Sequence, residues 1–118
     1  MKYILLVYYD EQALSDSERE HCYVESAQLT QELNASGQYL AANPLQSIST
    51  ATSVKVRNGK RLVTDGPFAE TREQLGGYFL IEAKNLDEAL GIAARIPVAR
   101  VGTIEIRPVV EIPGLPTG

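Results

Sequence analysis

Three segments of the chain have the apolar patterns of β-strands. Residues 3–9 form an apolar run without polar alternation, which predicts a strand covered on both faces. Residues 78–83 repeat this pattern and predict a second strand of the same kind. Residues 103–109 alternate between apolar and polar positions, which predicts a strand with one apolar and one polar face.

A long helix is predicted after the first strand. Ser15 and Glu18 have the spacing of a capping box, and Gly37 suits the position that follows a helix ending near Ser36. At about 100° per residue, one side of this helix carries Cys22, Ser26, Leu29, Thr30 and Leu33, with Tyr23 at its edge. The opposite side carries His21, Glu25, Gln28 and Glu32. We therefore expect the histidine to face water and the cysteine to be a small buried thiol.

A shorter second helix is predicted after residues 78–83. Asn85 is its expected N-cap, Glu88 follows three residues later, and Pro97 lies just past the expected end. Its apolar stripe is expected at Leu86, Ala89, Leu90 and Ala93.

A β-hairpin is predicted between the two helices. Asn58-Gly59 separates residues 54–57 from residues 60–64, and this dipeptide suits a type I′ turn. The four basic side chains Lys55, Arg57, Lys60 and Arg61 gather near its tip.

The remaining connections give weaker signals. Residues 38–45 predict a strand that stops at Pro44, and residues 47–53 are expected to be a loop or an irregular edge. Residues 70–74 are expected to form one helical turn before the strand at 78–83.

This order of elements predicts an α+β, ferredoxin-like βαββαβ-type domain with an extra hairpin. Residues 1–112 are expected to form a single domain, and residues 113–118 a flexible C-terminal tail. Both helices of such a fold lie on one face of the sheet. Because the strand at residues 3–9 is apolar on both faces, we expect a second copy to cover the other face in an isologous homodimer, which would enclose a cleft between two sheets.

Composition excludes several classes of function. The formal charge is −4, and the basic residues form a cluster only at the hairpin. Both observations disfavour nucleic-acid binding. One cysteine and one histidine offer no metal cluster and no internal disulfide, so we expect no metal and a reducing cytoplasm. No phosphate-loop pattern follows a strand, so no cofactor is expected. The N-terminal apolar run is too short to span a membrane.

Residues 63–79 concentrate turn formers and charges between two apolar runs. Gly66 can take a positive φ, Pro67 has φ near about −65°, and the Asp65 carboxylate can accept a hydrogen bond from amides just downstream. Backbone geometry alone therefore explains the turn.

Residues 64–78 of this segment, TDGPFAETREQLGGY, resemble the signature of the DGPF branch of the YCII-related proteins. Residues 1–3, 51–54, 94–97 and 105–109 extend the resemblance over nearly the whole chain. The resemblance implies a dimeric α+β barrel, bacterial and cytoplasmic, in a family whose members mostly lack an assigned activity. It also implies frequent genomic pairing with extracytoplasmic-function sigma factors.

Resemblance to the better-studied YCII branch would imply a His–Asp pair in the cleft. The histidine would lie on the first helix and the aspartate near the end of the second. Counting back from the glycine and the proline that follow the two helices places these positions near Ser26 and Ile96. A hydroxyl does not titrate near neutral pH, and an isoleucine cannot orient an imidazole. The pair therefore does not transfer to this chain.

Five residues are candidates for chemistry. Asp65 and Glu70 are the candidate catalytic carboxylates, although the adjacent Gly-Pro turn alone explains Asp65 fully and favours a structural role. Arg72, Tyr78 and Arg107 are the candidate ligand-binding residues. Glu70 and Arg72 could instead form an ordinary surface ion pair, Tyr78 could be a packing aromatic, and Arg107 could face solvent.

Three functions compete on this basis. The first is a dimer that binds a small polar or aromatic molecule in the cleft between the sheets, with or without acid–base catalysis. The alternative is a regulatory partner of an extracytoplasmic-function sigma factor. The third is a stable dimer that has lost its catalytic pair and its activity.

Overall fold

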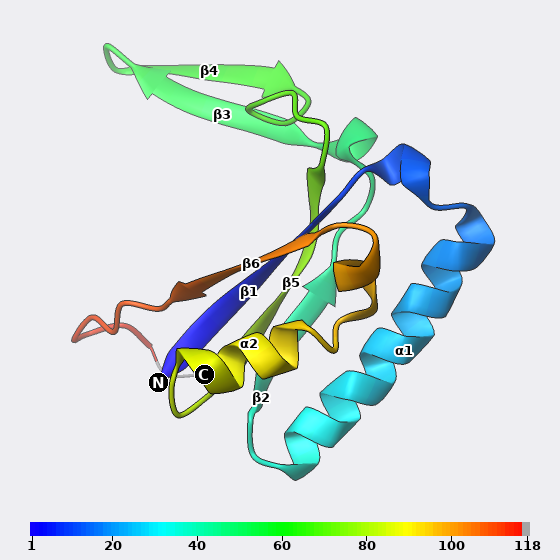
Figure 1. Ribbon diagram of the computed structural model, residues 1–118. Helices are drawn as coiled ribbons and strands as arrows, with labels where there is room; N and C mark the ends of the chain where they lie inside the picture. Colours follow the sequence, from blue (N-terminus) through cyan, green and yellow to red (C-terminus); the bar gives the residue numbers. More distant parts are fainter. Residues whose placement is uncertain (117–118) are drawn as a thin grey trace.

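A computed structural model describes residues 1–116 of the chain. Its main sheet has the order β2-β5-β1-β6, and every neighbouring pair is antiparallel (Figure 1). The strands are β1 (Lys2–Tyr9), β2 (Tyr39–Pro44), β5 (Gln74–Glu82) and β6 (Thr103–Pro108). The helices α1 (Asp16–Ala35) and α2 (Leu86–Ala93) follow β1 and β5, which confirms the predicted α+β, ferredoxin-like arrangement. Short 3₁₀ turns occupy Glu11–Ala13, Ile48–Thr50 and Pro97–Arg100.

Helix α1 begins and ends as its sequence predicts. The Glu18 N–H donates to Ser15 Oγ at 3.1 Å, and the Ser15 N–H donates to Glu18 Oε1 at 2.9 Å, which completes the capping box. Gly37 has φ 77°, and the Gln38 N–H donates to the Leu33 carbonyl at 2.8 Å. These bonds satisfy backbone groups that a helix end leaves unpaired.

Helix α2 begins as predicted, because Asn85 Oδ1 accepts from the Glu88 N–H at 3.0 Å. Its predicted apolar stripe is partly wrong. Leu86 and Leu90 are 51% and 49% exposed. The buried side chains are Ala89, Ile92 and Ala93. The helix has only eight residues, and the face that meets the sheet is centred on its second half.

The hydrophobic core lies between the two helices and one face of the sheet. Tyr3, Leu5, Val7 and Tyr9 of β1 point into it, whereas the residues between them are half-buried. Phe79 and Ile81 of β5 and Ile104 and Ile106 of β6 lie opposite these positions and join the same core. The helices thus cover one face of β1. The sequence predicted cover on both faces, and the helices of the described residues leave the second face uncovered.

We call the side of the sheet away from the helices the open face. The strand registers place on it Ile4, Leu6, Tyr8, Tyr78, Leu80, Glu105 and Arg107. The apolar members and both tyrosines are half-buried, and the two charged residues are exposed. The polar side of β6 therefore belongs to this face.

The predicted hairpin is confirmed as β3 (Thr52–Arg57) and β4 (Lys60–Asp65), which form a separate two-stranded sheet. Asn58 and Gly59 both have positive φ, 52° and 73°, as a type I′ turn requires. This hairpin arm projects away from the helices and the main sheet (Figure 1).

Two predictions about the connections are corrected. Strand β3 already begins at Thr52, so residues 47–53 are not wholly a loop. Residues 70–74 form no helical turn, because Gln74 already pairs with Tyr9 as the first residue of β5. The Thr71 hydroxyl donates to the Glu73 carbonyl at 2.6 Å and holds the preceding residues in a bend.

At the C-terminus, residues 113–116 form an exposed turn and a short irregular segment. The rest of the predicted tail, residues 117–118, lies outside the described residues. Neither α1 nor α2, within residues 1–116, combines the length and the apolar character that crossing a bilayer requires.

Candidate functional site

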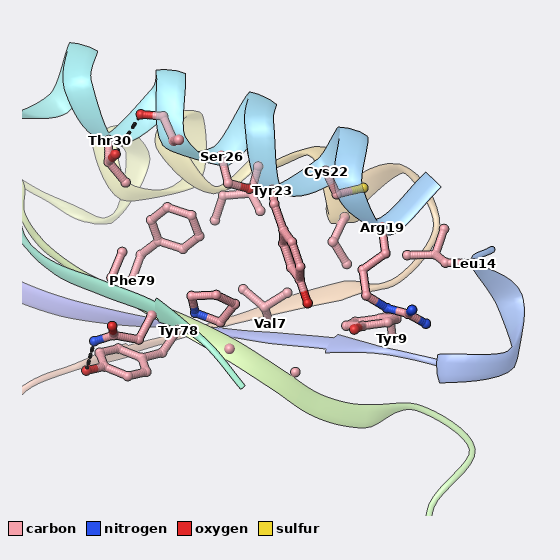
Figure 2. Close-up of a pocket in the computed structure, with 18 of the residues that line it drawn as sticks. Val7, Tyr9, Leu14, Arg19, Cys22, Tyr23, Ser26, Thr30, Tyr78 and Phe79 are labelled. Carbon is pink, nitrogen blue, oxygen red and sulfur yellow. Dashed lines mark hydrogen bonds between the residues drawn. The ribbon is translucent and has the colours of Figure 1, made fainter. Parts of the chain in front are cut away.

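A cavity of about 320 Å³ lies between α1 and the core-facing side of the sheet (Figure 2). Its lining comes from α1, β1, β2, β5 and the segment after α2. Eight of the lining residues have apolar side chains: Val7, Leu14, Ala27, Ala42, Pro44, Phe79, Ile96 and Val98. Its volume falls within the usual range for small-molecule sites, about 300–1,000 Å³.

Two glycines of β5 keep the floor of the cavity free of side chains. A Cβ atom on Gly76 would overlap the ring of Tyr9. A Cβ atom on Gly77 would lie 3.0 Å from the Asn43 carbonyl oxygen and 3.2 Å from Pro44 Cα. The Gly-Gly pair in the sequence motif therefore has a steric role, since it lets β2 and the Tyr9 ring approach β5 closely.

The polar side chains along the helix side of the cavity are Cys22, Tyr23, Ser26 and Thr30. The Thr30 hydroxyl donates to the Ala27 carbonyl at 2.7 Å, so its proton is already used. Burial, followed by the negative charge of Glu25, raises the pKa of the Cys22 thiol. The thiol lines the cavity and is half-buried, and its raised pKa disfavours the nucleophilic thiolate.

Arg19 is the one charged side chain among the residues that line the cavity. Figure 2 shows its guanidinium beside the Tyr9 ring, with the Tyr23 hydroxyl pointing toward the same end. The interaction with the Tyr9 side chain raises the pKa of Arg19, which therefore stays charged. Arg19 also contacts Asp16, with Nη1 to Oδ1 at 3.0 Å, and donates to the Glu11 carbonyl at 3.4 Å.

A second hollow of about 300 Å³ shares Tyr9, Arg19 and Tyr23 with the cavity. Its other lining residues are Glu11, Gln12, Leu45, Gln46 and Ser47. The cavity therefore continues at its Arg19 end into a more polar recess.

Glu11 ties the walls of this recess together. Its Oε1 accepts from the Ile48 N–H at 2.8 Å and its Oε2 accepts from the Ser47 hydroxyl at 2.7 Å. Its own N–H donates to Gln74 Oε1 at 3.1 Å. Both carboxylate oxygens thus accept hydrogen bonds from the loop that leads into β3.

The candidate residues from the sequence are not brought together. Asp65 ends β4, and Glu70 and Arg72 lie in the following loop; all three are exposed and none lines the cavity. Arg107 lies on the open face of β6. Tyr78 borders the cavity, but Figure 2 shows its ring on the side of the sheet away from α1.

The open face has an electrostatic feature of its own. Burial, followed by the nearby Glu105 carboxylate, raises the pKa of Tyr8, and the charge of Arg107 acts in the opposite direction. The Tyr78 hydroxyl accepts from Asn43 Nδ2 at 3.0 Å.

Two residues discounted on sequence both line the cavity. Ser26 and Ile96, which stand near the positions of the family's catalytic pair, meet at this one site. The two positions that the sequence resemblance singled out therefore lie at one cavity, with different chemistry at both. His21, in contrast, is exposed on α1, as its place on the polar side predicts.

The lining residues offer little acid–base or metal chemistry. Burial raises the pKa of Tyr23 as well as that of Cys22, so both stay protonated at neutral pH. Within the described residues, 1–116, no three His, Cys, Asp or Glu side chains group closely enough to hold a metal ion.

Comparison with known proteins gives two similarities. A sequence model of the YCII-related domain matches residues 1–113. An uncharacterised protein of Rhizobium meliloti (strain 1021) is 35% identical over 117 residues, which cover 92% of this chain and 91% of that protein.

Proposed function

We propose that this chain, which belongs to the YCII-related family, binds a small molecule in the cavity between α1 and the sheet. The observation that supports this proposal is the cavity itself, an apolar space of about 320 Å³. A concave space of this size, lined mainly by apolar atoms, is the usual form of a small-molecule site. The proposal places the ligand within one chain, whereas the sequence pointed to a cleft between two sheets.

The chemistry of the lining favours binding over acid–base catalysis. Its thiol and the Tyr23 phenol are held protonated at neutral pH, and Ser26 stands near the position of the family histidine. Asp65 and Glu70 lie outside the cavity, so catalysis through these carboxylates stays a prediction of the sequence.

Occupation of the cavity can be tested with a neutral bicyclic probe, 2-naphthamide. We expect it to raise the melting temperature of the wild-type chain and to shift the NMR signals of cavity residues. Ser26→Phe places a ring in the cavity and should abolish both effects. Gln28→Phe, on the exposed side of the same helix, is the matched control and should keep both. Failure of the wild type to bind the probe, or unchanged binding by Ser26→Phe, would contradict the proposal.

We also propose that a second copy of the chain covers the open face. Ile4, Leu6 and Leu80 form an apolar patch there that neither helix within residues 1–116 covers. Sedimentation velocity should show a dimer for the wild type and a monomer for Leu6→Lys, with Val63→Lys on the hairpin arm as control. A monomeric wild type at tens of micromolar concentration would refute this proposal.

The alternative role, as partner of an extracytoplasmic-function sigma factor, has support from the family resemblance alone. Pull-down of a sigma factor encoded beside the gene is its test, and the absence of binding would remove that specific version.

A further inference from the structure

We infer that the cavity takes an amphipathic carboxylate, with an apolar ring system against the sheet and a carboxylate at Arg19. This inference rests on the proposed function, because it names the chemical class of ligand for the same site. It depends on the distribution of charge around the cavity.

The inner part of the cavity suits an apolar body. Figure 2 shows Phe79 and Thr30 at the end of the cavity away from Arg19, with Val7 between that end and Arg19, and the Thr30 hydroxyl is already bonded to the helix backbone. A charged group in this part would lose its hydration without gaining a charged partner, which is strongly unfavourable. A charged ligand group is therefore confined to the other end.

Arg19 supplies the charge at that end. Its side chain is 27% exposed, so it is partly withdrawn from water. A guanidinium has five N–H donors. Within the described residues, one hydrogen bond joins it to the Asp16 carboxylate and one to the Glu11 carbonyl, and the Tyr9 side chain also interacts with it. The Asp16 side chain is fully exposed, and such surface pairs are worth little. Arg19 therefore has donors left for a further acceptor.

The nearby acidic side chains do not occupy the position beside Arg19 where a ligand carboxylate would bind. Both oxygens of Glu11 accept from the loop at Ser47 and Ile48 and stabilise the wall of the recess. Asp16 points to solvent. Among the cavity-lining residues themselves, the single formal charge is the positive one of Arg19. An ammonium ligand would place two like charges at the Arg19 end of the cavity, whereas a carboxylate pairs with the guanidinium.

Three probes with the same ring system and different polar groups test this inference: 2-naphthoate, 2-naphthamide and 2-naphthylmethylammonium. By calorimetry or NMR titration we expect the carboxylate to bind at least about tenfold more tightly than the amide, as a charge-assisted hydrogen bond implies. The ammonium should bind most weakly. Added salt should weaken binding of the carboxylate and leave binding of the amide unchanged.

Variants of Arg19 identify the residue responsible. Arg19→Gln should remove the preference for the carboxylate without changing amide affinity, and Arg19→Lys should keep part of it. Arg95→Gln, which removes an exposed arginine paired with Glu32, is the matched control and should keep the full preference. Amide binding by Arg19→Gln shows that the variant is folded.

The outcomes separate this inference from the proposed function. Equal affinity for carboxylate and amide, tighter binding of the ammonium, or an unchanged preference in Arg19→Gln would overturn the carboxylate assignment and leave the cavity as a binding site. Absence of binding by all three probes to the wild type would overturn both.

Discussion

The main sheet and the hairpin arm are built from similar residues but are covered to very different extents. Val7 of β1 is 6% exposed, whereas Val54, Val56 and Val63 of the arm are 60%, 62% and 58% exposed. All four valines favour a strand, and all four lie in one. Strand propensity therefore decides the local conformation, and the helices α1 and α2 decide which strands become core.

The two regions also differ in what holds them. The main sheet gains from burying apolar side chains beneath two helices, at about 25 cal/mol per Å² removed from water. The arm has its own ladder and its type I′ turn, and an isolated two-stranded hairpin is marginal in water. The arm is therefore expected to open locally while the sheet stays folded.

The largest expected effect comes from a core substitution. Leu5 is 0% exposed at the centre of β1, so Leu5→Ala should lower the free energy of unfolding by about 2–5 kcal/mol. Val63→Ala on the arm should change it by no more than about 0.5 kcal/mol. Urea unfolding of both variants measures the contrast, and equal losses would show that the arm is part of the core.

Glycine substitutions sharpen the comparison. A Cβ atom on Gly102 would overlap the Tyr8 carbonyl oxygen and lie 3.0 Å from Tyr9 Cβ, so Gly102→Ala should cost about 1–3 kcal/mol of global stability. Gly59→Ala strains only the turn of the arm, where φ is 73°.

For Gly59→Ala we expect faster amide exchange in β3 and β4 with an unchanged global urea midpoint. A large shift of that midpoint would mean that the arm and the sheet unfold together.

A smaller effect is expected where the arm meets the sheet. Glu11→Gln replaces an oxygen that accepts from Ser47 or Ile48 by an NH₂ donor, and the loss should be about 1 kcal/mol. The Ile48 amide should exchange faster by hydrogen–deuterium exchange, while Leu5 in the core stays protected. Glu111→Gln, at an exposed site, is the control. An unchanged Ile48 amide would contradict this role of Glu11.

The smallest expected effect concerns the pH dependence of a thiol. Burial raises the pKa of Cys22, so its alkylation by iodoacetamide should reach half of its maximal rate at a higher pH than for a free cysteine. A pKa raised in the folded state contributes stability at low pH that is lost as the pH rises through it. In the double variant Cys22→Ser/Val63→Cys the thiol lies on the exposed arm. Its alkylation should reach half of its maximal rate at the same pH as for a free cysteine. Equal pH–rate profiles for the two thiols would show that Cys22 is no more buried than a cysteine on the arm.

Local signals in the sequence predicted most of the fold. The capping box at Ser15, the positive φ at Gly37 and the turn at Asn58-Gly59 all depend on a few adjacent residues, and all three are confirmed. The predicted stripe of α2 was right at Ala89 and Ala93 but took Leu86 and Leu90 in place of Ile92, because the docking of a short helix depends on the sheet that it meets. The bend at residues 71–73 depends on the Thr71 hydroxyl bond, which a helical propensity does not capture.

The candidate site was harder to predict. The charges of the conspicuous motif drew attention to Asp65, Glu70 and Arg72, which lie outside the cavity. The cavity results from packing between α1 and β5, and its charged residue, Arg19, belongs to no motif. The apolar side of α1, together with the positions of Ser26 and Ile96, was the available signal. The glycines of the motif contribute to the site through the side chains that they lack.

The hydrogen bonds of Glu11 have a mechanical consequence. Its carboxylate holds the loop that enters β3, and its N–H holds Gln74, whose Nε2 donates at 2.8 Å to the Thr71 carbonyl in the segment that returns from β4. Both legs of the arm are therefore attached to one residue beside the mouth of the cavity. The orientation of the hairpin arm is therefore set at Glu11, and Glu11 also forms a wall of the recess at Arg19.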